Sequence, residues 1–177
     1  MSEPEHTFRL IDLFCGAGGM SLGFSESFGN SYESVWANDF SAASVATYRA
    51  NFGDHCVEGN IEELLKKTNV PKADIVIGGP PCQGFSLLNK KRKGDARRAL
   101  WRPFLDVVQL SEASCFVMEN VPQLLGSPEH AEIIKRAKEL GFSCFGFKLL
   151  AADYGVPQKR KRAFVIGSRK VDPTDYF

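Results

Sequence analysis

The chain has 177 residues, the size of one ordinary domain, and can bury a continuous core without disulfides or a structural metal. Its composition, 44% hydrophobic and 24% charged, is typical of a folded globular protein and disfavours a disordered or membrane-embedded one. The net charge of +1 says little as a total, because the basic residues are distributed unevenly along the chain.

Short apolar runs alternate with helical stretches in the first half of the chain. The apolar pattern predicts strands at residues 8–14, 34–37, 56–57 and 74–77. Helical spacing predicts helices at residues 20–28, 41–51 and 61–67. Asn60 precedes the last of these helices, and we expect it to cap the helix N-terminus.

The same alternation continues in the second half of the chain. Further strands are expected at residues 115–118, 143–150 and 162–168, and further helices at residues 100–111 and 129–140. Strands that alternate with helices of about ten residues pair in parallel through right-handed crossovers. The sequence therefore predicts a single α/β domain over residues 1–177, with a doubly wound, mostly parallel sheet of seven strands.

Unusual residues stand at the carboxyl ends of these strands, where doubly wound sheets bind ligands. They are Gly16 to Gly19, Asn38 with Asp39, Asn60, Pro80 to Cys82, and Glu119 with Asn120. Because the carboxyl ends of parallel strands meet at one edge of a sheet, we expect all of these residues at the same edge.

The glycine turn, residues 16–19, follows the first strand and leads into a helix. Glycine lets the backbone approach a ligand, and the amides of a helix N-terminus point toward it. By itself, such a loop is more often a tight turn than a nucleotide site. Asp39 follows the second strand, where a carboxylate can accept hydrogen bonds from both ribose hydroxyls. Together the two features point to a cofactor that contains adenosine.

The five cysteines form no C-x-x-C pair and have no matching His cluster, so we expect neither a disulfide framework nor a metal site. Cys82 follows two prolines and precedes a basic loop, and positive surroundings favour the nucleophilic thiolate. Cys56, Cys115 and Cys144 fall on strand segments and are expected to be small buried hydrophobes. Cys15 lines the glycine turn, where it could touch a cofactor without reacting.

Two basic segments, residues 86–102 and 158–170, hold 13 of the 22 Lys and Arg residues and one acid. If the segments meet in space, their positive field favours a polyanion such as nucleic acid. Two solvated loops would explain the same charges equally well. In the second segment Arg160 and Arg162 share one parity, so one face of the strand carries both arginines.

Glu119 follows the apolar run 115–118. A carboxylate at the end of a buried strand is desolvated and suited to hold or donate a proton. A helix cap or a salt-bridged acid is an equally consistent interpretation of this residue by itself.

Four separated runs resemble, in order and spacing, the signature motifs of the cytosine-C5 DNA methyltransferases. They are DLFCGAGG at residues 12–19, PCQGFS at 81–86, ENV at 119–121 and QKRKR at 158–162. The similarity extends over residues 8–169. It implies a Rossmann-like methyltransferase fold, S-adenosyl-L-methionine as methyl donor, and DNA (cytosine-5-)-methyltransferase activity of the kind found in restriction-modification systems.

The resemblance also implies a role for each matching residue. The cofactor would be held by Phe14, Gly16, Gly18, Gly19, Asn38, Asp39, Asn60, Ile61, Pro81 and Leu100. In the reaction, the Cys82 thiolate would add to C6 of a flipped-out cytosine while Glu119 binds N3 and the exocyclic amine. Arg162 would bind O2, with Arg160 beside it. Double-stranded DNA would be contacted by Ser86, Lys90, Lys91, Arg92, Arg97 and Gln158.

The chain departs from the family pattern in three ways. Asn60 stands where an aspartate is usual, and Asp39 where the longer glutamate is usual. The sequence also stops before the family's target-recognition domain and final helix. We therefore expect residues 1–177 to be the catalytic part of the enzyme, and to be inactive or weakly active alone. The chain would belong to a split enzyme with a second polypeptide, be part of a longer chain, or be a natural remnant.

Two alternative functions remain open from the sequence. The chain could be a non-catalytic nucleic-acid-binding or regulatory module, although the intact Cys82, Glu119 and Arg162 argue against that. It could also methylate a transfer RNA cytosine, as a related subfamily does. No apolar run approaches the roughly 18 residues of a membrane span, and no signal-peptide core is present, so we expect a cytoplasmic protein, or a nuclear one in a eukaryote.

Overall fold

The computed structural model describes residues 7–28, 31–81 and 99–176. The chain divides into two compact units. The first unit comprises Met1–Gly78 and Asp106–Ala113, and the second comprises Gly79–Leu105 and Ser114–Phe177. Among the described residues, no helix combines the length and apolar character needed to cross a membrane.

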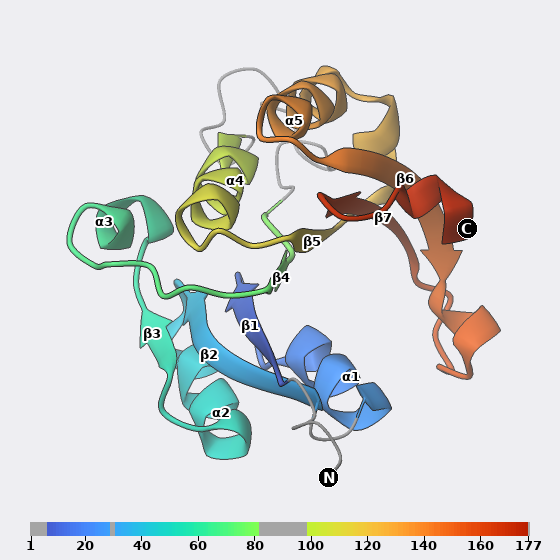
Figure 1. Ribbon diagram of the computed structural model, residues 1–177. Helices are drawn as coiled ribbons and strands as arrows, with labels where there is room; N and C mark the ends of the chain where they lie inside the picture. Colours follow the sequence, from blue (N-terminus) through green and yellow to red (C-terminus); the bar gives the residue numbers. More distant parts are fainter. Residues whose placement is uncertain (1–6, 29–30, 82–98, 177) are drawn as a thin grey trace, which may run out of the picture. The chain divides into compact units, whose positions relative to one another are not determined.

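Within the described residues the sheet has seven strands and is mixed, and four of these strands belong to the first unit. They are β1 (Phe8–Leu13), β2 (Tyr32–Asp39), β3 (Cys56–Glu58) and β4 (Ile75–Gly78). Their order is β3-β2-β1-β4 and all of their pairings are parallel (Figure 1). The chain steps outward from β1 to β3 and then returns to the other side of β1. This reversal is the switch point at which doubly wound sheets open a ligand crevice.

Three helices of the first unit follow its strands: α1 (Gly19–Phe28), α2 (Ala42–Phe52) and α3 (Ile61–Leu65). The Ser41 side chain caps α2 by accepting a hydrogen bond from the amide of Ser44. Asn60 caps α3, as the sequence predicts, and accepts from the amide of Glu62 at 2.8 Å. These two caps fix where α2 and α3 begin, shortly after the carboxyl ends of β2 and β3.

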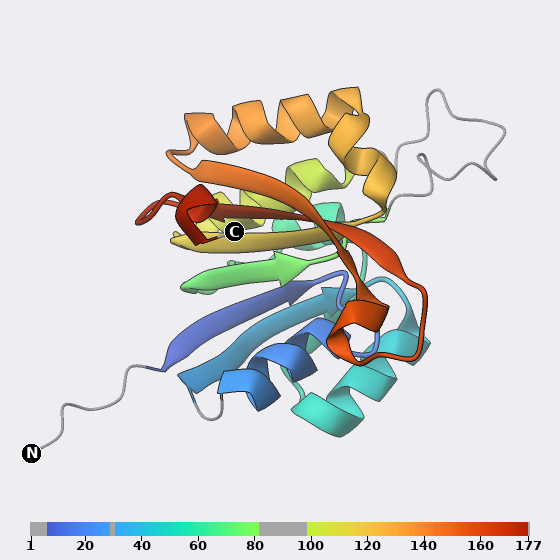
Figure 2. The same cartoon turned by 90° about the vertical axis from the view of Figure 1, so that its right-hand side faces the viewer.

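The second unit contains β5 (Cys115–Asn120), β6 (Ser143–Leu150) and β7 (Lys161–Ser168) in the order β5-β7-β6. Strand β7 is antiparallel to both of its neighbours. Helix α5 (Pro128–Glu139) lies along β6 (Figure 2) and buries Ile133 and Ala137. The short 3-10 helices η3 (Pro122–Gly126) and η4 (Ala151–Tyr154) connect these elements, and a third, η5 (Pro173–Tyr176), follows β7.

Helix α4 (Trp101–Leu110) begins in the second unit and ends in the first. In the second unit its Phe104 packs edge-on against Phe116 of β5, with ring centroids 6.0 Å apart. In the first unit the carbonyl of Ser111, just after the helix, accepts a hydrogen bond from the amide of Ala73.

Every strand and helix that the sequence predicts is present, and the α/β fold with seven strands is confirmed. Strand β2 is longer than predicted by two residues at each end, and β5 extends to Asn120 because Glu119 and Asn120 pair with Phe164 and Ala163 of β7. Glu119 therefore belongs to the strand itself, and not to the loop after it. The reversed direction of β7 is the main feature that strand–helix alternation does not predict.

Candidate active site

The glycine turn joins β1 to α1 in the first unit. Phe14, Gly16 and Gly18 have φ values of +55°, +55° and +93°, so the turn depends on left-handed conformations. A Cβ at Gly18 would collide with the ring of Phe52 from α2, whereas a Cβ at Gly16 would meet no atom within 4 Å. One side of the turn is thus packed against α2, and open space borders the turn at Gly16.

Asp39 holds the glycine turn from the end of β2. Its Oδ2 accepts the amide hydrogen of Gly16 at 2.9 Å, and its Oδ1 accepts that of Ser41 at 2.8 Å. The amide of Cys15 donates in turn to the carbonyl of Asn38 at 3.1 Å. A carboxylate oxygen has more than one acceptor site, so Asp39 can fix the turn and still accept from a ligand hydroxyl.

Asn38 and Asn60 both make hydrogen bonds within the protein. Asn38 is 1% exposed, and its Nδ2 donates to the carbonyls of Val57 and Gly59 at 2.9 and 3.0 Å. It therefore ties β2 to β3 beneath the edge of the sheet and does not present its amide to solvent. Asn60 is exposed, but its Oδ1 is the oxygen that caps α3.

Apolar side chains near the end of β2 differ in their exposure. Phe40, which follows Asp39, is 78% exposed, whereas Ile61 is 2% exposed and Phe14 is half-buried. An exposed aromatic ring costs free energy in water and offers a flat surface to a heterocycle. Phe40 is not among the site residues predicted from the sequence; an aromatic residue directly after an acid at a strand end is the pattern that indicates it.

Asp12 lies under the glycine turn in a buried polar network. It is 1% exposed; its Oδ2 accepts from the Ser21 hydroxyl at 2.8 Å, and among the described residues its Oδ1 has no hydrogen-bond partner. The Ser21 hydroxyl is 2.9 Å from that of Tyr48, which lies 3.2 Å from Nε2 of His55. Burial raises the pKa of Asp12 to about 7 and that of Tyr48 to about 12.

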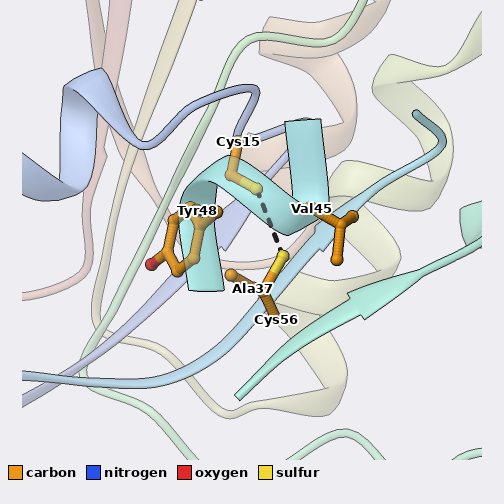
Figure 3. Close-up of a cluster of buried hydrophobic side chains, with 5 residues drawn as sticks. All are labelled: Cys15, Ala37, Val45, Tyr48 and Cys56. Carbon is orange, nitrogen blue, oxygen red and sulfur yellow. Dashed lines mark hydrogen bonds between the residues drawn. The ribbon is translucent and has the colours of Figure 1, made fainter. Parts of the chain in front are cut away.

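The thiol of Cys15 points into the core of the first unit. It lies 3.6 Å from the sulfur of Cys56, in a cluster with Ala37, Val45 and Tyr48 (Figure 3). Burial raises the pKa of both thiols above the ordinary value. The Cys15 sulfur also lies 3.7 Å from the carbonyl oxygen of Gly16 in the turn, and Cys56 is the buried hydrophobe that the sequence predicts.

In the second unit, Glu119 lies against two arginines that precede or begin β7. Its Oε1 is 2.9 Å from Nε of Arg162 and 3.3 Å from Nη2 of Arg160. The side chains of Glu119, Arg160 and Arg162 are 21%, 46% and 26% exposed. Because β7 is antiparallel to β5, its first residues lie beside the last residues of β5. The two arginines share a face, as their spacing predicts, and it is the face of Glu119.

Asn120 ties the segment before Cys82 to the end of β5. It is 5% exposed, its Nδ2 donates to the carbonyl of Pro80 at 3.1 Å, and its Oδ1 accepts from the amide of Val121 at 2.9 Å. Asn120 lies in a sequence motif that predicts no separate role for it. A buried amide must satisfy both donor and acceptor groups, and that requirement was the available signal.

The remaining predicted site residues are only partly covered by the structure. Pro81 and Leu100 are half-buried, and Gln158 is exposed in the connection between η4 and β7. The other predicted residues lie outside the described part of the chain: Cys82, Ser86, Lys90, Lys91, Arg92 and Arg97.

Solved structures with the same fold identify the class of protein. A DNA modification methyltransferase encoded within an E. coli prophage superposes with a TM-score of 0.76 at 30% identity, over 93% of this chain and 47% of that one. The S. pombe Dnmt2 methyltransferase, at 21% identity and a TM-score of 0.75, has the same fold over 93% of this chain and 52% of its own. The fold is thus that of the Rossmann-like methyltransferases.

The sequence defines the family within that class. The chain belongs to the C-5 cytosine-specific DNA methylases, whose family pattern matches residues 8–175. It is 37% identical to the type II methyltransferase M.AgeI of Thalassovita gelatinovora and 40% identical to M1.HphI of Haemophilus parahaemolyticus, over 93% and 90% of its length. The alignments span only 41% and 45% of these relatives. The chain is also 37% identical, over 91% of its length, to M.AquIA of a Picosynechococcus species, and this alignment covers 72% of M.AquIA.

Proposed function

We propose that this chain is the catalytic part of an enzyme that transfers a methyl group from S-adenosyl-L-methionine to C5 of a flipped-out cytosine in DNA. Membership of the cytosine methylase family supports the reaction type. The observation that carries the proposal is the Glu119 carboxylate with both arginines on a single oxygen. Such a group can accept a hydrogen bond from the exocyclic amine of a cytosine while the arginines balance its charge.

The residues of the first unit fit the proposed cofactor. Open space beside Gly16 and Gly19 leaves the glycine turn accessible to an extended ligand. Asp39 would accept from the ribose hydroxyls, and the exposed ring of Phe40 would cover one face of the adenine. Asn60 would stand at the adenine amine. When bound, S-adenosyl-L-methionine supplies an electrophilic methyl group.

The chemistry requires the cytosine ring to lose its aromaticity before C5 can act as a nucleophile. The Cys82 thiolate would add to C6 and form a carbon–sulfur bond. With a proton shared between N3 and the Glu119 carboxyl, Glu119 would hydrogen-bond N3 and accept a hydrogen bond from the exocyclic amine, and Arg162 would donate to O2, so that the charge developing on the ring is stabilised. After C5 gains the methyl group, loss of its proton to a base and departure of the Cys82 sulfur would restore the ring.

A cytosine in a stacked duplex is out of reach, so the proposal includes base flipping. The basic segment 86–102 would close over the extruded base and contact phosphates. Gln158 is exposed and therefore available to DNA. Binding would weaken steeply with salt, because neutralised phosphates release counterions.

The chain spans less than half the length of M.AgeI and M1.HphI, so recognition of a target sequence is assigned here to a further segment or a second polypeptide. We propose for that reason that the isolated chain is inactive or weakly active in turnover, while it keeps the ability to form the covalent adduct over hours. M.AquIA shows that a related methyltransferase chain can be closer to this length.

Covalent trapping tests this proposal even if turnover is slow. The chain is incubated for hours with S-adenosyl-L-methionine and duplex DNA containing 5-fluorocytosine, whose C5 fluorine blocks the final elimination. We expect an adduct on denaturing gels and in mass spectra, and expect Cys82→Ser to abolish it. Cys144→Ser, which changes a half-buried cysteine of β6, is the matched control. An adduct absent from wild type, or retained in Cys82→Ser, would refute the proposal; an adduct on transfer RNA alone would change the substrate.

A further inference from the structure

The two oxygens of the Glu119 carboxylate have different surroundings. Oε1 lies 2.9 Å from Nε of Arg162 and 3.3 Å from Nη2 of Arg160. Within the described part of the chain, Oε2 takes part in no hydrogen bond or ion pair. The carboxylate is thus anchored through one oxygen, and the other keeps its acceptor capacity for a ligand.

Gly79 borders the second oxygen. A Cβ at this position would lie 3.2 Å from Oε2 of Glu119 and 3.9 Å from its backbone oxygen. A 3.2 Å contact is tighter than nine in ten real Cβ contacts, so the carboxylate would have to yield by a few tenths of an ångström. Because Oε1 is held by both arginines, that movement would disturb their contacts, and the 3.3 Å contact with Arg160 is already near its limit.

The backbone after Gly79 has little freedom to move away instead. Pro80 and Pro81 have fixed φ angles, and the Pro80 carbonyl is bound by the side chain of Asn120. Gly79 itself does not have a positive φ, so alanine could adopt its backbone conformation. The property that glycine supplies here is therefore space, and not conformational freedom.

We propose that Gly79 is a positioning residue, whose missing side chain keeps Oε2 of Glu119 free and aligned for the substrate base. In this arrangement Oε1 serves as the anchor and Oε2 as the oxygen that binds the cytosine ring. The inference rests on the proposed function, because it assigns the free oxygen to the base that Glu119 would bind.

Gly79→Ala tests this role by the rate of adduct formation on 5-fluorocytosine DNA. Displacing a reacting group by 1 Å costs on the order of 100-fold in rate, so a few tenths of an ångström should slow trapping about fivefold. The affinity for S-adenosyl-L-methionine should stay within about twofold. Gly126→Ala is the matched control, because Gly126 is in the same unit, has no positive φ and has nothing within 4 Å of its Cβ position. Trapping at the wild-type rate in Gly79→Ala would overturn the inference.

A double-mutant cycle separates positioning from general damage to the fold. In a Glu119→Ala background the added methyl at position 79 has no carboxylate to displace, so Gly79→Ala should cause less than a twofold further loss. An undiminished effect in that background would show that Gly79 acts elsewhere, and would overturn the role assigned to it.

The Nε–H signal of Arg162 in NMR spectra gives a readout that needs no activity. It should exchange slowly with water in wild type and Gly126→Ala, and faster in Gly79→Ala, because the contact with Glu119 is disturbed. If the wild-type chain forms no adduct, the proposed function fails, and this signal alone decides whether Gly79 controls the position of Glu119. Unchanged exchange in Gly79→Ala would then refute the inference.

Discussion

The buried carboxyl of Asp12 makes the stability of the chain depend on pH. Burial raises its pKa to about 7 from an ordinary value of 3.8. The neutral carboxyl therefore contributes stability that is fully present below pH 3.8 and is lost as the pH rises through 7. With ~1.4 kcal/mol for each pKa unit, the whole effect is about 4 kcal/mol, of which about 2.5 kcal/mol is lost between pH 5 and pH 8.

We expect Asp12→Asn to remove this dependence, because an amide does not titrate. Urea unfolding at pH 5, 6, 7 and 8 gives the free energy of unfolding of both chains. The difference, variant minus wild type, should rise by about 2.5 kcal/mol from pH 5 to pH 8. The slope is the test, because an amide NH2 in place of the unpartnered Oδ1 costs ~1–3 kcal/mol at every pH. Burial also lowers the pKa of His55, but His55 is present in both chains and its contribution cancels to first order.

Asp106→Asn is the control for the loss of one aspartate, because Asp106 is exposed on α4. Its unfolding free energy should follow that of wild type across the same pH range. A difference curve for Asp12→Asn that is flat between pH 5 and pH 8 would refute the reasoning, because it would mean that Asp12 is already ionised in the native chain.

Three further predictions concern the turn, the thiols and the arginines. Gly18→Ala should lower the free energy of unfolding, measured in urea titrations, by about 2 kcal/mol or more, because the φ of +93° and the adjacent ring of Phe52 both oppose a Cβ. A loss below about 0.5 kcal/mol would contradict this prediction. Cys15 and Cys56 should resist iodoacetamide in the native chain at pH 8, as followed by mass spectrometry, because burial hides them and raises the pKa of both thiols; labelling as fast as in urea would disprove it. Arg162→Ala should slow adduct trapping more than Arg160→Ala, since Arg162 is nearer to Glu119 and less exposed, and equal effects would rule this out.

Much of the fold is accessible from the sequence because local pattern and tertiary structure agree. The apolar run of β1, the Asn60 cap and the glycine turn each specify their own structure within a few residues. The direction of β7 could not be derived in this way. It depends on the pairing of Glu119 with Phe164, which are far apart in the chain, and on the hairpin that joins β6 to β7.

Site residues could be predicted where local spacing alone determines their placement. They could not be predicted where the role depends on tertiary contacts with other residues. The common parity of Arg160 and Arg162 was sufficient to place them together. The sequence could not show that the Asn38 side chain donates its hydrogen bonds to two carbonyls in and after β3. That arrangement depends on how deeply the end of β2 is buried. The role of Gly79 could not be predicted from the sequence either, because it depends on the space that glycine leaves for Oε2 of Glu119.

Strand β7 is eight residues long, so its two ends are separated by about 25 Å. A β7 running in the same sense as β5 would have carried its arginines to the remote end of the ladder, and Glu119 would have met the residues near Ser168 instead. The single reversal of direction in this unit is what brings two cations from late in the sequence to an acid about forty residues earlier. A redesign that made β7 parallel to β5 would separate Glu119 from Arg160 and Arg162, although all three side chains would still be present.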